Sequence, residues 1–207
     1  MIKEIVLTGG PCAGKTSALT KIEEHLTKKN YKVFIVAESA TELIKSGISP
    51  VDPNGVGLYE FQKLLLIYQI QKEELYKKIA KEFPHDKKVI IYDRGLFDNK
   101  TYVSEEEFEE ILKYVSNYLN MEITEMNILN RYDMVIHLTT SAKGDAKNYT
   151  LENNKARSET IEAAIRLDKK SRECWKSHSN LHIIENYETF EEKMEVILDT
   201  INDFLDK

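Results

Sequence analysis

Near its N-terminus the chain reads Gly9-Gly10-Pro11-Cys12-Ala13-Gly14-Lys15-Thr16-Ser17. Residues 9–16 match the pattern G-x-x-x-x-G-K-[ST] at every fixed position. A short apolar run, residues 2–7, precedes the stretch, and a run with helical spacing, residues 15–27, follows it. Glycines in such a strand-to-helix turn let backbone N–H groups approach a phosphate, and the helix N-terminus adds unpaired donors. The sequence therefore predicts a phosphate-binding loop.

The loop has an expected role in binding ATP and Mg²⁺. We expect the backbone of residues 9–17 to surround the phosphates, Lys15 to reach the β- and γ-phosphates, and the Thr16 hydroxyl to ligate Mg²⁺. The competing interpretation is a glycine-rich turn that binds nothing. Cys12 is interpreted as a small residue whose backbone takes part in binding, and an exposed reactive thiol is the alternative.

Strand-like and helix-like runs alternate along the chain. Apolar runs indicate strands at residues 2–7, 31–37, 88–93, 133–138 and 181–184. Periodic runs indicate helices at residues 15–27, 58–83, 122–130, 159–176 and 189–205, with a further helix opening at a Ser104–Glu107 capping box. This alternation is typical of an α/β fold in which helices cover both faces of a parallel sheet. The length of 207 residues favours one domain over residues 1–207.

Two parts of this pattern carry more specific expectations. The helix at residues 58–83 is predicted from Phe61, Leu65, Tyr68, Leu75 and Ile79, which recur at helical spacing. The stretch at residues 139–155 is polar and aperiodic. Together with the helix that follows it, we expect the segment 139–178 to stand off the core as a lid.

The charge balance and the cysteines restrict the classes of partner. The chain has 29 Lys and Arg against 35 Asp and Glu, a net charge of −6, which argues against a nucleic-acid partner. No apolar stretch approaches the roughly 18 residues of a membrane span, so no membrane association is expected. Cys12 and Cys174 lack metal-ligand spacing and suit a reducing, cytoplasmic location.

A second polar motif, Asp93-Arg94-Gly95, follows the third predicted strand. In proteins with a phosphate loop, an acid at a neighbouring strand end takes part in holding Mg²⁺, so we expect Asp93 to do so. An arginine directly after it would bind an anionic or developing phosphate, which favours transfer to a substrate over transfer to water. The alternative is a surface salt bridge at the strand end.

Glu38 directly follows the second predicted strand. Ligands of doubly wound sheets lie outside the carboxyl ends of the strands, so Glu38 is expected on the same rim as the phosphate loop. There it could take a proton from an attacking hydroxyl or hold a sugar. The alternative is that Glu38 only caps the start of the next helix.

Three arginines lie in the predicted lid. Glu162 precedes Arg166 by four residues and Asp168 precedes Arg172 by four, which is the spacing of surface ion pairs on a helix. Arg157 has no such partner, so we expect it to be the lid arginine that binds the transferring phosphate.

Three further polar residues have two interpretations each. Gln62 and Gln69 on the helix at residues 58–83 could read a nucleobase edge, but exposed polar side chains are the favoured interpretation. His137, near the end of the fourth predicted strand, is expected to be a packed residue because no metal-ligand spacing surrounds it.

Taken together, the motifs resemble those of a known family. They are the phosphate loop, Glu38, Asp93-Arg94-Gly95 and the series Arg157, Asp168, Trp175, His178. The chain resembles P-loop kinases of the AAA-type ATP-binding domain family that includes nicotinamide riboside kinase domains, and is more distantly similar to deoxynucleoside and nucleoside monophosphate kinases. The resemblance implies a P-loop NTPase fold with strand order 2-3-1-4-5, Glu38 as the catalytic acid, and Asp93-Arg94 as an acid–arginine pair.

We therefore predict ATP- and Mg²⁺-dependent phosphoryl transfer to a small molecule, with a nucleoside or nucleotide favoured. A GTPase is disfavoured because the sequence lacks N-K-x-D: Asn99-Lys100 and Asn154-Lys155 both fail at the fourth position. The remaining alternative is a regulatory module that binds ATP with slow or no turnover. The partners implied are a small-molecule substrate and, as an open alternative to a monomer, a second copy of the chain.

Overall fold

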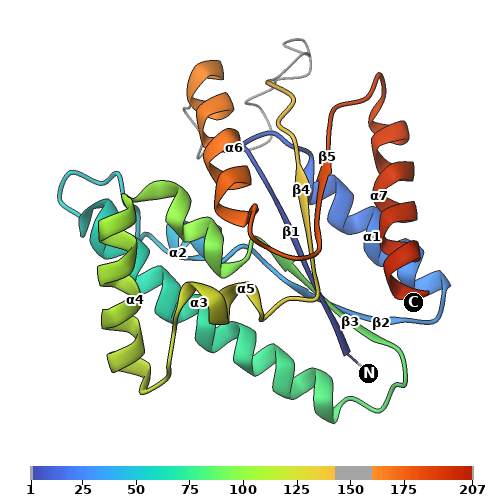
Figure 1. Ribbon diagram of the computed structural model, residues 1–207, viewed down its shortest axis with the longest axis horizontal. Coiled ribbons are helices and arrows are strands. Elements are labelled where there is room, and N and C mark those ends of the chain that lie inside the picture. Colours follow the sequence, from blue (N-terminus) through green and yellow to red (C-terminus); the bar gives the residue numbers. More distant parts are fainter. Residues whose placement is uncertain (1, 143–159, 207) are drawn as a thin grey trace.

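A five-stranded parallel sheet forms the centre of the computed structural model, which describes residues 2–142 and 160–206 (Figure 1). The strands are β1 (Ile2–Gly9), β2 (Lys32–Val36), β3 (Lys88–Asp93), β4 (Met134–Leu138) and β5 (Leu181–Ile184). Their order is β2-β3-β1-β4-β5, and every pairing is parallel. The predicted strand order is confirmed. It puts β1, and therefore the phosphate loop, in the middle of the sheet.

The helices also follow the sequence-based expectation. They are α1 (Lys15–Lys28), α2 (Ser39–Lys45), α3 (Gly57–Glu82), α4 (Glu105–Leu119), α5 (Glu125–Leu129), α6 (Ile161–Trp175) and α7 (Phe190–Leu205), with a 3-10 helix η1 (Leu96–Tyr102). The Ser104–Glu107 capping box is confirmed at the start of α4. The sequence analysis gave no range for α2 or η1, because seven residues are too few for a helical period to stand out. Among the described helices, none has the length and apolarity that a membrane span requires.

Two helical layers cover the two faces of the sheet (Figure 1). Side chains alternate along a strand, so Ile5 and Leu7 of β1 pack toward α1 and α7, whereas Val6 packs toward the opposite face. That opposite layer is built from α3, α4, α5, η1 and α6. The core is therefore continuous on both sides of β1, as the sequence pattern indicated.

The helix predicted at residues 58–83 is present as α3, but the apolar residues that indicated it do not all face the core. Phe61 and Leu65 are buried, but Tyr68, Leu75 and Ile79 are exposed, Leu75 by 55%. The buried face also carries polar side chains, Gln62, Gln69 and Glu73, next to Leu66, Ile70 and Ala80. The spacing of apolar residues alone does not identify a buried face that is partly polar.

The described part of the predicted lid also differs from expectation. Helix α6 packs against η1 and β1 and does not stand off the core. Trp175 at its end is fully buried, and a Cβ on Gly95 would lie 2.8 Å from the Trp175 ring. The remainder of the predicted lid, residues 143–159, lies outside the described residues.

Candidate active site

The turn between β1 and α1 has the backbone that its glycines predict. Gly9 has φ 146° and Gly14 has φ 85°, and the non-glycine Cys12 between them has φ 56°. A Cβ on Gly9 would lie 2.2 Å from the carbonyl oxygen of Leu138, so this position has no room for a side chain. The loop therefore keeps its shape through glycine at the positions where the chain turns most sharply.

The functional side chains of the loop lie at the start of α1. Lys15 is buried, whereas Thr16 and Ser17 are exposed, so their hydroxyl groups are accessible to a ligand. The α1 N-terminus begins at Lys15 without a side-chain cap, which leaves its first N–H groups available to an anion. This arrangement has the donors that a phosphate site needs.

Asp93 ends β3 directly beside the loop, opposite Leu7 of β1. Burial raises the pKa of Asp93 above its ordinary value, and the nearby Lys15 ammonium opposes that rise. The Oδ1 atom of Asp93 is buried and has no hydrogen-bond partner among the described residues. An unsatisfied carboxylate oxygen near the Lys15 ammonium fits Mg²⁺, which takes oxygen ligands and keeps several waters.

In the parts of the chain that the structure describes, no group of three or more His, Cys, Asp or Glu side chains forms a cage. Mg²⁺ in phosphoryl-transfer sites is held by one or two protein oxygens together with substrate phosphates. The predicted metal ligands Thr16 and Asp93 carry oxygen atoms of the kind that this pattern uses.

Arg94 and Glu38 form a close ion pair on the same rim. Arg94 Nε lies 2.6 Å from Glu38 Oε1, and Arg94 Nη1 lies 3.5 Å from Asp98 Oδ1. Burial by itself would lower the pKa of Arg94, but Tyr102, Glu38 and Asp98 raise it well above its ordinary value. Arg94 is 9% exposed, so the surface salt bridge considered from the sequence is not what the structure contains.

The Glu38 carboxylate faces Arg94 and does not cap the helix that follows it. Glu38 is the N-cap residue of α2, but its side chain makes no capping hydrogen bond to the helix backbone. Its Oε2 accepts a hydrogen bond from the Thr41 hydroxyl at 2.6 Å, while Oε1 faces Arg94. The carboxylate is thus turned toward the rim of the sheet.

Asp98 is a site residue that the sequence analysis missed. Its Oδ1 accepts hydrogen bonds from the hydroxyls of Thr8 and Ser171, and its Oδ2 accepts from the Gly95 amide at 2.9 Å. These bonds tie β1, η1 and α6 together behind Arg94. Nothing in the sequence marked Asp98, because the Gly95 to which its carboxylate bonds has no side chain to complete a capping box.

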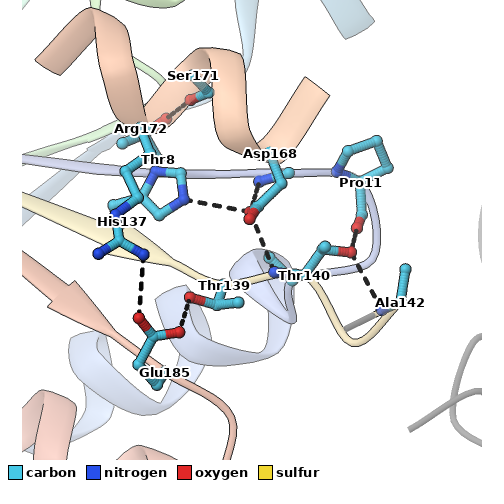
Figure 2. A network of polar contacts seen from close by, with 12 residues as sticks. Thr8, Pro11, His137, Thr139, Thr140, Ala142, Asp168, Ser171, Arg172 and Glu185 are labelled. Carbon is cyan, nitrogen blue, oxygen red and sulfur yellow. Dashed lines mark hydrogen bonds and ion pairs between the residues drawn. The ribbon is translucent and has the colours of Figure 1, made fainter. Parts of the chain in front are cut away.

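Asp168 joins α6 to the phosphate loop, as Figure 2 shows. Its Oδ1 accepts hydrogen bonds from the amides of Gly10 and Thr140, both at 3.1 Å, and lies 3.2 Å from His137 Nε2. His137 is fully buried, so its prediction as a packed residue is confirmed. A Cβ on Gly10 would lie 2.7 Å from the Asp168 Cβ, which explains this glycine.

The predicted surface pair of Asp168 with Arg172 is therefore wrong. Asp168 is fully buried, and Arg172 Nη1 instead pairs with Glu185 Oε1 at 3.0 Å (Figure 2). The structure records no Glu162–Arg166 ion pair within residues 160–206. A side chain at a helical i,i+4 spacing can face the core, and the sequence does not show which face does.

The two glutamines are buried, so the expectation of exposed polar side chains is wrong. Gln69 donates from Nε2 to the carbonyl oxygen of Arg94 at 3.2 Å. Gln62 is 4% exposed, and its Oε1 has no hydrogen-bond partner in the described chain. Gln62 and Gln69 are seven residues apart, close to two helical turns, so both lie on the face of α3 that borders Arg94.

Lys193 on α7 is a further residue that the sequence analysis missed. Its Nζ donates to the carbonyl oxygens of Thr139 at 2.8 Å and Ala13 at 3.3 Å, and to Asn186 Oδ1 at 3.1 Å. Burial lowers the pKa of Lys193 to about 8. The residue fixes the far side of the phosphate loop, and nothing in the sequence separates it from the many surface lysines.

A pocket of about 420 Å³ lies elsewhere, between η1, the start of α4 and the end of α6. Its wall includes Lys100, whose ammonium already pairs with Glu105 and Glu125. None of its described lining residues belongs to the phosphate loop or to the Asp93–Arg94 pair. The candidate active site is therefore the rim formed by Lys15, Glu38, Asp93 and Arg94.

Solved structures with the same fold include two of a deoxyadenosine kinase from M. mycoides. One has dATP bound; it has a TM-score of 0.61 and 18% identity, and the match covers 97% of this chain and 99% of that one. The other has dCMP and a flexible dCDP bound, with a TM-score of 0.63, 18% identity and the same coverage. At this identity the likeness concerns the fold.

Sequence comparison finds a curated relative and a family. A thymidylate kinase from Mesoplasma florum is 29% identical over 102 residues, which are 47% of this chain and 47% of the kinase. The chain thus spans about half the length of the curated relative it matches. A family model described as an AAA domain matches residues 4–193, almost the whole chain. With the phosphate loop, the strand order and this match in agreement, the chain belongs to the AAA domain family.

Proposed function

We propose that this chain is a P-loop kinase that transfers the γ-phosphoryl group of ATP, with Mg²⁺, to a small-molecule acceptor. The observation that carries the proposal is the partly buried Arg94–Glu38 pair at 2.6 Å, close to Lys15 and Asp93. Transfer to an acceptor hydroxyl requires a cation that binds the transferring phosphoryl group and a base that takes the hydroxyl proton. The Arg94 guanidinium and the Glu38 carboxylate are groups of these two kinds.

The donor side of the reaction uses the loop. The backbone of residues 9–17 surrounds the phosphates, and Lys15 contacts the β- and γ-phosphates as a positive charge. Thr16 and Asp93 would hold Mg²⁺, which would neutralise charge on the phosphate oxygens. Lys193 and Asp168 keep the loop in this shape from behind.

The acceptor side uses Glu38 and Arg94. An oxygen of the acceptor hydroxyl attacks the γ-phosphorus, the bond from phosphorus to the β–γ bridging oxygen breaks, and ADP leaves with that electron pair. Glu38 takes the hydroxyl proton as general base. Arg94 binds the equatorial oxygens of the group in transfer, where charge is spread in the transition state.

A nucleoside or nucleotide is the favoured acceptor class. The relatives with known activity, a thymidylate kinase and a deoxyadenosine kinase, are kinases of such compounds. Gln62 supports the same class, because its buried, unpartnered Oε1 could accept from a base edge. A Gln62 side chain whose amide oxygen is not used by the protein itself keeps that oxygen for a hydrogen bond to a nucleobase.

Arg157 remains the proposed lid arginine. It lies outside the described residues, while Arg166 is exposed and Arg172 pairs with Glu185. Arg157 is thus the arginine of this group for which we propose a role at the transferring phosphate.

An ADP-release screen over nucleosides, nucleotides and vitamin-like alcohols tests the proposal. A kinase releases ADP much faster with one compound than without it, and that compound gains a phosphate detectable by mass spectrometry. Slow ADP release that no compound stimulates would favour the regulatory module instead. Lys15→Ala is the matched control, since a contaminating kinase would keep its activity in that preparation.

A further inference from the structure

A buried carboxylate lies behind the Asp93-Arg94-Gly95 turn. Glu73 on α3 is fully buried, and both of its oxygens accept hydrogen bonds from the Tyr132 hydroxyl, at 3.0 and 3.1 Å. Its Oε2 also pairs with Arg131 Nε at 3.3 Å. Burying a charged carboxylate costs free energy, so we expect a structural role of Glu73 in the contacts that surround it.

The first contact from Glu73 to the turn runs through Gln69. The Gln69 Nε2 lies 3.4 Å from Glu73 Oε1 and 3.2 Å from the carbonyl oxygen of Arg94. At its other end, Gln69 Oε1 accepts from Asn99 Nδ2 at 3.0 Å. Because a carboxylate and a carbonyl can only accept, the donor end of the Gln69 amide must face them, and its orientation is fixed.

The second contact runs through Tyr132. Its hydroxyl donates toward Glu73 and accepts a hydrogen bond from the amide of Leu96 at 3.0 Å. Gln69 and Tyr132 therefore bind the backbone on the two sides of Gly95, at the carbonyl of Arg94 and at the amide of Leu96. Glu73 is the group that both of them share.

The backbone between these contacts needs support. Arg94 has φ 69°, in the left-handed region, which costs about 1–2 kcal/mol for a residue with a Cβ. Such a conformation persists where the surroundings determine it. The Arg94 amide also donates to the carbonyl oxygen of Leu7 at 3.1 Å, so the residue is held at both its amide and its carbonyl.

We propose that Gln69 and Tyr132, anchored together by Glu73, are positioning residues that hold Arg94 in its left-handed conformation and aim its guanidinium at the phosphoryl group in transfer. None of the three needs to touch a substrate. The expected effect of this positioning on the reaction rate rests on the kinase function proposed above. The expected effect on the backbone of the turn does not.

The anchor has a consequence for pH. Burial raises the pKa of Glu73 to about 7, while Arg131 and Tyr132 oppose the rise. The charged and titratable groups that face it are Arg131, Tyr132, Lys77 and Tyr92. A protonated Glu73 has fewer acceptor sites for the Tyr132 and Gln69 donors, so we expect their hold on the turn to weaken as the pH falls through about 7, even though loss of the buried charge favours the folded state as a whole.

Four variants test the proposal. Gln69→Met and Tyr132→Phe each remove one contact, and Glu73→Gln removes the shared charge with little change of shape. Glu74→Gln is the matched control, because Glu74 pairs with the same arginine, Arg131, at 2.7 Å but has no bond to the turn. Thermal unfolding of each variant establishes that it is folded before its kinetics are compared.

We expect kcat to fall about 10- to 100-fold in the three test variants, the scale of a misplaced catalytic group, while the KM for ATP changes little. Wild-type kcat should fall on the acid side with a midpoint near the Glu73 pKa of about 7, and Glu73→Gln should lose that limb. Glu74→Gln should keep both the wild-type rate and its pH profile. A loss of rate in Glu74→Gln equal to that in Glu73→Gln would overturn the proposal, since it would reflect the Arg131 ion pairs alone.

Hydrogen exchange separates this proposal from the proposed function. The amides of Arg94 and Leu96 should exchange faster in Gln69→Met and Tyr132→Phe than in wild type or Glu74→Gln, whether or not the chain turns over ATP. Faster exchange in a chain without transferase activity would reject the kinase and keep the positioning role. Wild-type exchange at both amides, or wild-type kcat in both contact variants, would reject the positioning role.

Discussion

The Asp168 carboxylate on α6 lies 3.1 Å from the amide nitrogen of Gly10 in the phosphate loop, across 158 residues of chain. One oxygen of this carboxylate also accepts from the Thr140 amide and faces His137 (Figure 2). A fully buried anion thus holds two backbone segments that border the nucleotide site. The shape of the loop depends on α6 as well as on its own glycines.

Replacing Asp168 by Asn should loosen the loop. The Asn side chain has the shape of Asp but lacks the negative charge that attracts the Gly10 amide, the Thr140 amide and His137. We therefore expect the free energy of unfolding to fall by about 1–3 kcal/mol. ATP affinity should fall as well, because the Gly10 amide loses its fixed direction. Urea unfolding and nucleotide titration measure the two effects. Arg172→Gln, which breaks only the half-exposed pair with Glu185, should change stability by under about 0.5 kcal/mol; equal losses in the two variants would contradict this role.

Asp93→Asn should affect the metal dependence of the reaction. The carboxylate oxygen without a hydrogen-bond partner is the atom assigned to Mg²⁺, and an amide is a much weaker ligand for that ion. We expect a large shift of the activity to higher magnesium concentrations, with a smaller change in metal-free nucleotide binding. An unchanged magnesium titration would assign Asp93 a structural role only.

Glu38 and Arg94 should act as a unit. Glu38→Gln and Arg94→Lys are each expected to reduce kcat strongly, because the first removes the base and the second the planar fork. Since the groups are 2.6 Å apart, the double variant should lose much less than the product of the two single losses. Multiplicative losses in a double-mutant cycle would mean that the two residues work independently.

Arg157→Ala tests the proposed lid arginine. We expect kcat to fall more than ATP affinity does. The fall in kcat should be smaller than the roughly 10³–10⁵-fold effect of an isolated arginine finger, because Arg94 also binds the charge on the transferring phosphate. Arg157→Lys should restore only part of the rate, as an ammonium cannot bind two oxygens in a fork. Arg166→Ala is the control with an exposed arginine; if it loses activity while Arg157→Ala does not, the assignment is wrong.

Glu73 predicts how stability depends on pH. The pKa of Glu73 in the folded protein, about 7, lies above the ordinary 4.5, so the folded state binds the proton more tightly than the unfolded state does. Stability from this group is complete below about pH 4.5 and declines as the pH rises to about 7, by a few kcal/mol at most. Denaturant unfolding of Glu73→Gln should show a weaker decline across this window, and an identical pH dependence would count against the assigned titration.

The sequence was most informative where function follows from adjacent residues. The glycines, Lys15 and Thr16 stand in one motif, and Asp93 and Arg94 stand at the end of an apolar strand, so their positions could be predicted. Asp98, Asp168, Lys193 and Glu73 act through contacts with distant segments, and no local spacing distinguishes them from surface charges. Gln62 and Gln69 were assigned to solvent for the same reason: polarity indicates an exposed face only when no buried partner is available.

The central position of β1 has a consequence for the order in which the protein can be made. Ile2 lies opposite Lys88 and Ile5 opposite Met134, so β1 leaves the ribosome well before β3 and β4, the strands with which it pairs. The nucleotide loop then still lacks Asp168. A nascent chain that ends before α6 should therefore carry the complete ATP motif without binding ATP, and its apolar first strand should be a binding site for chaperones during synthesis.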